Sequence, residues 1–210
     1  MNTTAAHHAD FWFDPVCPWS WMTSRWMHEV EGVRPVTTRW HVMSLAILQD
    51  NPRLPRAYRQ MLLEARGPAR VCVAAAHEHG DEVVGPLYTA LGTRFHNRGL
   101  PHTRSVVEDA LRETGLPAGL AEHLTAQTYD SALYDSHKAA VALVGEDVGT
   151  PVIALDGPSV PDRTAFFGPV VSPTPHGEAA GRLWDGVVLV ASTPGFSELK
   201  RTRTRGPDFR

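Results

Sequence analysis

The stretch FWFDPVCPWSWMTSRW, residues 11–26, decides the fold of this chain. Its aromatic start belongs to a run, ADFWFD at 9–14, that ends before a proline, as is typical of a strand. Cys17 and Pro18 follow almost at once, and apolar residues then recur four apart, as in a helix. Pro18 suits the first helical turn, where its missing N–H would have had no partner. The stretch therefore predicts a strand that leads into a helix ending at Gly32, with Cys17 at the joint.

Outside this stretch the chain changes between extended and helical patterns. Residues 36–43, VTTRWHVM, alternate between β-branched or aromatic and polar positions, which predicts a second strand in a β-α-β unit. Residues 50–146 are rich in Ala, Leu, Arg and Glu and carry apolar side chains at helical spacing, so we expect a block of helices. Breaks between these helices are expected at Gly67-Pro68, Gly85-Pro86, Gly99-Leu100-Pro101 and Gly115-Leu116-Pro117.

The last quarter of the chain returns to extended structure. Two strands are predicted at 150–155 and 164–167, and the turn-rich residues 156–162 between them predict a hairpin with a long polar connection. Residues 176–190 predict a final helix, and the charged tail at 201–210 is expected to be mobile.

This order of elements predicts an α/β protein with the thioredoxin fold and an inserted α-helical domain. The strand-helix-strand unit and the later hairpin and helix would form the thioredoxin-like core, from residues 1–48 and 147–210. The helical block, residues 49–146, would form the inserted domain.

The composition excludes several classes of protein. The 210 residues carry 20 Lys and Arg against 23 Asp and Glu, a net charge of −3 that is too balanced for a nucleic-acid or polybasic membrane binder. No apolar run approaches the roughly 20 residues that span a bilayer, and the N-terminal residues lack a signal-peptide pattern, so we expect a cytoplasmic protein. The 2 cysteines and 11 histidines form no spaced metal motif, and we predict no metal site.

Cys17 is the first candidate for chemistry. At the joint of a strand and a helix it lies where unpaired backbone N–H groups and the positive end of the helix dipole converge. Both favour thiolate over thiol, so we expect a lowered pKa and a nucleophilic sulfur. The alternative for an isolated cysteine is a buried apolar residue. We assign that alternative to Cys72, which lies in an apolar helical run, VCVAAA.

The motif around Cys17 resembles the active-site start of the DsbA-like branch of the thioredoxin superfamily, where the pattern is Cys-Pro-x-Cys. Within that branch the chain resembles the actinobacterial mycothiol-dependent reductases, also called nitroreductases, and the similarity extends over nearly the whole chain. The stretches that carry it are FWFDPVCPWSWMTSRW, HVMSLAIL, VGEDVGTP, FFGPV and ELKRTRT.

The resemblance implies a cis peptide bond at Thr150-Pro151, facing the active-site cysteine and positioning the partner. The chain departs from the family pattern at Ser20, which stands where the second, resolving cysteine would be. Serine does not resolve a mixed disulfide, so we predict a monothiol site in which the Ser20 hydroxyl donates a hydrogen bond toward the Cys17 sulfur.

The first functional hypothesis is a monothiol thiol-disulfide oxidoreductase. Cys17 would form a mixed disulfide with a low-molecular-weight thiol, which the resemblance identifies as mycothiol, and would reduce a disulfide or a small-molecule acceptor. Trp19, Trp21 and Tyr58 would supply a flat contact surface for the substrate. No tightly bound cofactor is expected, because neither dinucleotide nor P-loop motifs occur. A homodimer is left open.

The second hypothesis is a cis/trans double-bond isomerase on a repurposed scaffold, in which Cys17 adds reversibly to a conjugated polyene or enone, including thioester substrates. The run FDPVCPWSW is also similar to the start of kappa-class glutathione transferases and hydroxychromene-carboxylate isomerases. Asp14 matches their aspartate, although an aspartate at a strand end is more often a turn former. The residues 156–163 are interpreted as an expanded loop at the substrate mouth. A third alternative is a binding module without chemistry. His41 and His137 are interpreted as core residues.

Overall fold

A computed structural model describes residues 7–51, 53–157 and 160–209 of the chain. Its centre is a four-stranded sheet in the order β2-β1-β3-β4. The first two strands, β1 (His7–Phe13) and β2 (Val36–Val42), are parallel, as a strand-helix-strand unit requires. The third strand, β3 (Val152–Gly157), pairs antiparallel with β1. The fourth, β4 (Val160–Phe167), pairs antiparallel with β3. This topology confirms the thioredoxin fold.

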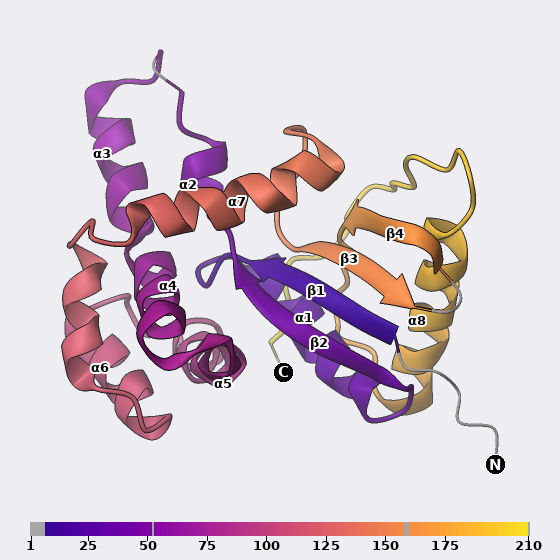
Figure 1. The fold of residues 1–210 in the computed structure, drawn as a ribbon, viewed down its shortest axis with the longest axis horizontal. Helices are drawn as coiled ribbons and strands as arrows, with labels where there is room; N and C mark the ends of the chain where they lie inside the picture. Colours follow the sequence, from indigo (N-terminus) through magenta and orange to yellow (C-terminus); the bar gives the residue numbers. More distant parts are fainter. Residues whose placement is uncertain (1–6, 52, 158–159, 210) are drawn as a thin grey trace.

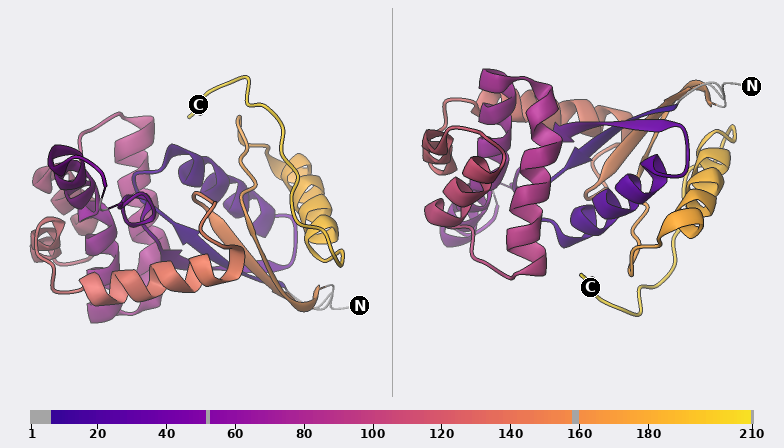
Figure 2. Two further views of the ribbon diagram at one scale, coloured as in Figure 1. Left: turned by 90° about the horizontal axis from the view of Figure 1, so that it is seen from above. Right: turned by 90° about the horizontal axis from the view of Figure 1, so that it is seen from below.

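Helices cover both faces of the sheet (Figures 1 and 2). The first helix, α1 (Pro18–Glu31), packs against α8 (Gly177–Ala191) on one face, and α7 (Asp130–Val144) crosses the other. Successive side chains of β1 therefore enter different clusters: Phe11 and Phe13 face the main core, whereas Trp12 packs with Val152 under α7.

The remaining helices gather beside one end of the sheet (Figure 1). Between β2 and α7 the chain forms α2 (Leu45–Leu48), α3 (Arg56–Ala65), α4 (Gly67–His79), η1 (Asp81–Val83), α5 (Val84–Gly92), η2 (Thr93–Asn97), α6 (Arg104–Glu113) and η3 (Ala118–Leu124). The predicted helical block is confirmed, and the division of the chain into two domains remains a prediction. Within the helices that the structure describes, none is long and apolar enough to cross a membrane.

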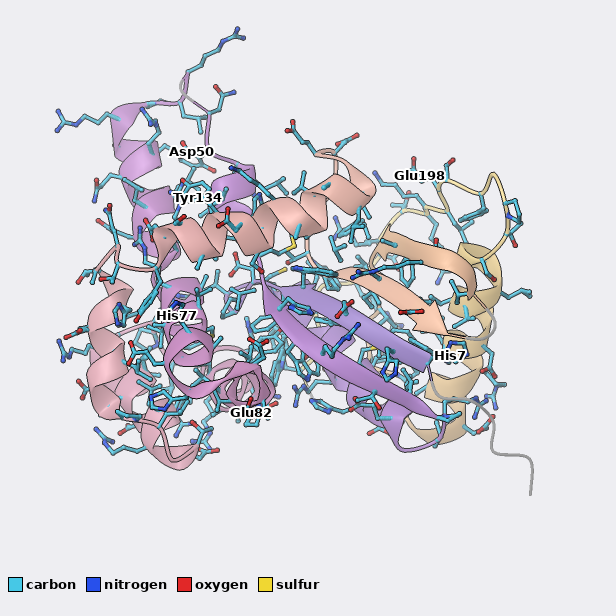
Figure 3. The ribbon with its side chains drawn as sticks, in the orientation of Figure 1. His7, Asp50, His77, Glu82, Tyr134 and Glu198 are labelled. Carbon is cyan, nitrogen blue, oxygen red and sulfur yellow. The ribbon has the colours of Figure 1, made fainter. Side chains whose placement is uncertain are left out.

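A buried arginine fixes the helices around α7. Arg66, between α3 and α4, donates to the hydroxyl of Tyr134 at 2.8 Å and to a carboxylate oxygen of Asp50 at 2.7 Å. Figure 3 shows Tyr134 on α7 below Asp50. Because Arg66 is only 3% exposed, this charge is compensated inside the protein, as buried ion pairs require.

Two sequence expectations about the fold are wrong. The break expected at Gly85-Pro86 lies earlier, at Gly80, because Pro86 occupies the first turn of α5, where a missing N–H costs nothing. The long connection expected at 156–162 is also wrong, because β3 runs to Gly157 and β4 begins at Val160. The described residues of the range 156–163 therefore lie in strands and form no expanded loop, and residues 158–159 lie outside the described part of the chain. As the edge strand of the sheet, β4 tolerates the turn-forming residues that suggested a loop.

The charged C-terminal tail, whose mobility stays a prediction, contacts the rest of the fold. Its described part is not a detached segment but runs back from α8 toward the helices beside the sheet, and the C-terminus ends between them and α1 (Figures 1 and 2). Hydrogen bonds hold it there: Asn97 donates to the Phe209 carbonyl at 2.7 Å, and Ser172 donates to the Gly206 carbonyl at 3.1 Å. The composition of the tail alone could not predict these partners.

Candidate active site

Cys17 is the N-cap residue of α1, as predicted. Its sulfur accepts the backbone N–H of Ser20 at 3.4 Å, and its thiol donates to the carbonyl of Thr150 at 3.8 Å. The backbone N–H of Cys17 donates to the carbonyl of Asp14 at 3.0 Å, which closes the turn between β1 and α1. The sulfur is thus fixed between the first turn of α1 and the residue before Pro151.

The pKa of Cys17 does not follow the sequence expectation. The side chain is only 4% exposed, and burial raises the pKa of the thiol, because the thiolate loses its hydration. Interactions with Thr150 and with the N–H of Ser20 lower the pKa, and the nearby Asp14 carboxylate raises it. The net direction is upward, so the expected lowered pKa is wrong for this arrangement.

Three buried hydroxyls around Cys17 have no hydrogen-bond partner among the described residues: Ser20 Oγ, Thr150 Oγ1 and Tyr88 Oη. The prediction that the Ser20 hydroxyl donates to the Cys17 sulfur is therefore wrong, since the backbone N–H of Ser20 makes that contact. Tyr88, on α5, was missed by the sequence analysis. Burial and the charge of the nearby Cys17 raise the pKa of its phenol, whereas the neighbouring side chains of Ser20 and Ser24 lower it. No pattern in the sequence pairs α5 with α1.

Asp14 links the Cys17 turn to the first residue of α2. One carboxylate oxygen accepts the N–H of Val16 at 3.0 Å, and the other accepts the N–H of Leu45 at 2.8 Å. Burial raises the pKa of Asp14 to about 6, although both hydrogen bonds lower it. The aspartate is therefore a turn former, as its position at a strand end suggested, and it also places a carboxylate near Cys17.

The Thr150-Pro151 peptide bond is cis, as the resemblance implies. Thr150 is 3% exposed and presents its carbonyl to Cys17. The carbonyl of Pro151 accepts the N–H of Gly168 at 2.9 Å, which ties this segment to the end of β4. Thr150 and Pro151 thus lie beside Cys17, where the sequence analysis expected them.

The three aromatic residues predicted to contact substrate differ in their positions. Trp19 is half-buried in the first turn of α1. Trp21 is only 2% exposed, and its ring packs against Tyr88 and His96, so it belongs to the core. Tyr58 is exposed on α3, and no described contact joins it to Cys17. Of these three aromatic residues, Trp19 alone lies half-buried in the N-terminal turn of α1, two residues after Cys17.

The other cysteine and the two singled-out histidines are not part of this site. Cys72 is fully buried in α4, and burial raises the pKa of its thiol strongly. His137 is buried, as expected, and accepts the N–H of Ser44 at 3.5 Å. His41 is not a core residue, because it is about one-third exposed and pairs with Asp10 at 2.8 Å. Among the described residues no group of side chains is arranged to hold a metal ion.

The chain is similar to known proteins. A family model described as Rv2466c-like, mycothiol-dependent nitroreductase Rv2466c, matches residues 16–201. The uncharacterized protein Rv2286c of Mycobacterium tuberculosis is 28% identical over 198 residues, which cover 93% of this chain and 82% of that protein.

Two solved structures share the fold. The probable DsbA oxidoreductase SCO1869 of Streptomyces coelicolor has a TM-score of 0.56 at 16% identity, over 96% of this chain and 97% of that one. The cytosolic disulfide reductase DsbM of Pseudomonas aeruginosa has a TM-score of 0.56 at 15% identity, over 87% and 99%. Both have the DsbA-like thioredoxin fold. Because the family model spans most of the chain, the protein belongs to the Rv2466c-like family of mycothiol-dependent nitroreductases.

Proposed function

We propose that this protein is a monothiol thiol-disulfide oxidoreductase in which Cys17 alternates between a free thiol and a mixed disulfide with mycothiol. The observation that carries the proposal is the position of Cys17 at the start of α1, with a serine at the position of the resolving thiol. The other cysteine, Cys72, is fully buried within α4. Resolution must therefore come from a second molecule of the low-molecular-weight thiol.

The chemistry is thiol-disulfide exchange. The Cys17 thiolate attacks one sulfur of a disulfide; the sulfur-sulfur bond breaks, and the other sulfur leaves as a thiolate that takes up a proton. Cys17 is now joined to the remaining acceptor sulfur. A first mycothiol thiolate attacks the Cys17 sulfur of this bond, releases the acceptor as a second thiol and leaves Cys17 in a mixed disulfide with mycothiol. A second mycothiol thiolate attacks the mycothiol sulfur of that mixed disulfide, which releases the Cys17 thiolate and forms mycothiol disulfide. Each cycle reduces one acceptor disulfide and oxidises two thiols. We propose a cytoplasmic location, where such thiols are kept reduced.

Each residue near the sulfur has a role in this proposal. Cys17 is the nucleophile, and Pro18 begins the helix whose N–H at Ser20 stabilises the thiolate. Thr150 and Pro151 hold the incoming partner beside the sulfur, and Trp19 provides an apolar contact surface. The burial of Cys17 makes loss of its proton dependent on the site opening to the partner. Trp21 and Tyr58 have no direct contact with the partner in this proposal. Trp21 contributes to the packing of α1, and Tyr58 is part of α3.

A second candidate is the cis/trans isomerase. The three unpartnered hydroxyls around Cys17 favour it, because they could donate to the oxygen of an enolate. In that reaction the Cys17 thiolate adds to a conjugated double bond, the resulting single bond rotates, and the thiolate is expelled again. No net oxidation occurs, and no mixed disulfide forms.

Intact-mass measurement of the reduced protein distinguishes the two candidates. The protein is exposed to mycothiol disulfide in one sample and to a conjugated polyene thioester in another. Cys17→Ala is the test variant, and Cys72→Ala controls for the second thiol. We expect a mass gain of one mycothiol in the wild-type protein and in Cys72→Ala, none in Cys17→Ala, and reversal by free mycothiol. No mass gain from mycothiol disulfide, together with isomerisation of the polyene that requires Cys17, would identify the protein as an isomerase.

A further inference from the structure

The C-terminal segment that contacts Trp19, in the first turn of α1, is strongly basic. Lys200, Arg201, Arg203 and Arg205 occur within six residues, whereas the chain as a whole has a net charge of −3. All four side chains are exposed. None of them forms an ion pair with a described residue, although the protein pairs many of its other arginines with carboxylates. We call residues 200–205 the basic segment.

The basic segment lies against the N-terminal turn of α1. The Arg203 guanidinium lies 5.0 Å from the centre of the Trp19 ring, within the range of a cation-π interaction, and Trp19 follows Cys17 by two residues. The residues that follow are anchored by Ser172, which accepts the N–H of Asp208 at 3.0 Å, and by the Asn97 hydrogen bond to Phe209. One of these anchoring residues, Ser172, belongs to the segment after β4, and the other, Asn97, belongs to η2.

A second chain of contacts joins the tail to the Cys17 turn. The Phe209 ring lies 5.7 Å from that of His96, and His96 contacts the carbonyl of Pro15 at 3.0 Å. A cavity of about 680 Å³ lies along the tail. Its lining residues include Arg205 and Asp208, which carry opposite charges, and the anchoring residues Asn97 and Ser172. The acidic residue at the other end of the tail, Glu198, lies in the loop above β4 (Figure 3).

We propose that the basic segment binds the anionic group of the acceptor, so that the enzyme prefers disulfides or other small acceptors that carry a carboxylate or a similar anion. The proposal rests on the nucleophilic role of Cys17 and adds the substrate class. An anionic acceptor that approaches the Cys17 thiolate and the Asp14 carboxylate is repelled by both. Arg203 and Arg205 offset this repulsion and raise the local concentration of anions at the cavity.

The test compares two aromatic disulfides that release a coloured thiol when Cys17 attacks them. Dithiobis(nitrobenzoate) is a dianion, and dithiodipyridine is neutral. The variant Arg203→Gln/Arg205→Gln removes two charges and keeps side chains of similar size. The variant with lysine at both positions, Arg203→Lys/Arg205→Lys, keeps the charges. Arg182 is exposed on α8, and Arg182→Gln controls for the loss of a positive charge away from the tail.

At low ionic strength we expect the glutamine variant to react about five-fold more slowly with the anionic disulfide, and within about two-fold of the wild-type rate with the neutral one. The lysine variant and Arg182→Gln should keep the wild-type preference. The difference should fade at about 0.5 M salt, where charges are screened within a few ångströms.

Two outcomes would overturn the proposal. If the reaction rates with both reagents change equally, the tail only covers the site, and if the rate with the anionic reagent does not change, the basic segment has no role in the reaction. These outcomes leave the role of Cys17 intact. If neither reagent modifies Cys17 in the wild-type protein, the proposed oxidoreductase function is wrong and the substrate preference is wrong with it.

Discussion

Cys17 lies where the fold exerts opposite effects on one thiol. The N–H of Ser20 points at the sulfur and favours the thiolate, whereas burial and the Asp14 carboxylate favour the neutral thiol. The sequence shows the first effect, because strand, cysteine and proline are adjacent in the chain. It does not show the second, because burial depends on Thr150 and on helices that are distant in sequence. The position of the nucleophile was therefore predictable from the sequence, whereas the direction of its pKa shift was not.

Removing the buried carboxylate should make Cys17 more reactive. In Asp14→Asn the charge that raises the pKa of Cys17 is lost, so we expect the pH profile of alkylation by iodoacetamide to move to lower pH. The difference from wild type should be largest above about pH 6, where Asp14 is ionised. The rate of Cys17 alkylation is measured by mass spectrometry between pH 5 and 10 at roughly half-unit steps. A profile that is unchanged or moves to higher pH would contradict this prediction.

Restoring the second thiol should convert the site to a dithiol. In Ser20→Cys the new sulfur lies one helical turn from Cys17, so we expect oxidation to remove two hydrogens and to block alkylation of both cysteines. Ser24→Cys is the matched control, since it lies on the same helix about one further turn away and cannot reach the sulfur. Peptide mapping after oxidation identifies the pairing. Free, alkylatable Cys17 in oxidised Ser20→Cys would show that the side chain at position 20 cannot reach the sulfur.

At the scale of elements, the site depends on the close approach of α1 and α5. A Cβ atom on Gly92 would lie 2.2 Å from the ring of Trp21, whose other contacts include the Arg25 guanidinium, 3.9 Å from the ring centre, and the stacked ring of His96. The ring has contacts on several sides and little room to move. Gly92 is therefore the position at which α5 passes Trp21, which places Tyr88 of the same helix close to Ser20.

Filling this contact should destabilise the protein. We expect Gly92→Ala to lower the free energy of unfolding by about 1–3 kcal/mol, because overpacking outweighs the better helix propensity of alanine. Gly186→Ala, in α8, is the matched control: its new methyl group meets no atom within 4 Å, and we expect a gain of about 0.5–1 kcal/mol. Urea unfolding of the two variants measures both values. Equal effects would show that Trp21 can move away from α5.

Elements were predictable where the sequence pattern is local. Cys17-Pro18 marks the start of α1 and Gly32 its end: Pro18 is the first residue of the helix, and Cys17 and Gly32 are its N-cap and C-cap residues. Gly85-Pro86 was misread because proline is compatible with both a break and a first turn, and only the preceding turn at Gly80 distinguishes them. The connection after β3 was misread because turn-forming residues also occur in edge strands.

At the scale of the whole molecule, the inserted helices and the sheet share one hydrophobic core. The Phe13 ring, at the end of β1, stacks on Tyr88 of α5 at 3.7 Å, and Trp40 of β2 approaches the same tyrosine at 6.0 Å. A single cluster contains residues of β1, α1, α4, α5, α6 and α8. No periodicity in the sequence pairs these elements, so the joint between them, like the docking of the tail, could not be predicted from local patterns.

This shared core leads to a prediction about unfolding. All six tryptophans, at positions 12, 19, 21, 26, 40 and 184, lie outside residues 49–146, so tryptophan fluorescence reports on the sheet and its helices. Circular dichroism at about 222 nm reports mainly on the helices, most of which lie within the inserted block. Because the Phe13, Trp21 and Tyr88 rings pack across the boundary, separating the two parts would expose a large apolar surface, and we expect both probes to give coincident urea transitions. Gly92→Ala should shift both curves together. Different urea midpoints for fluorescence and dichroism, in the wild-type protein or only in that variant, would show that the inserted helices unfold independently of the sheet. In that case the proposed site at Cys17 would lose its support from α5 before the sheet unfolds.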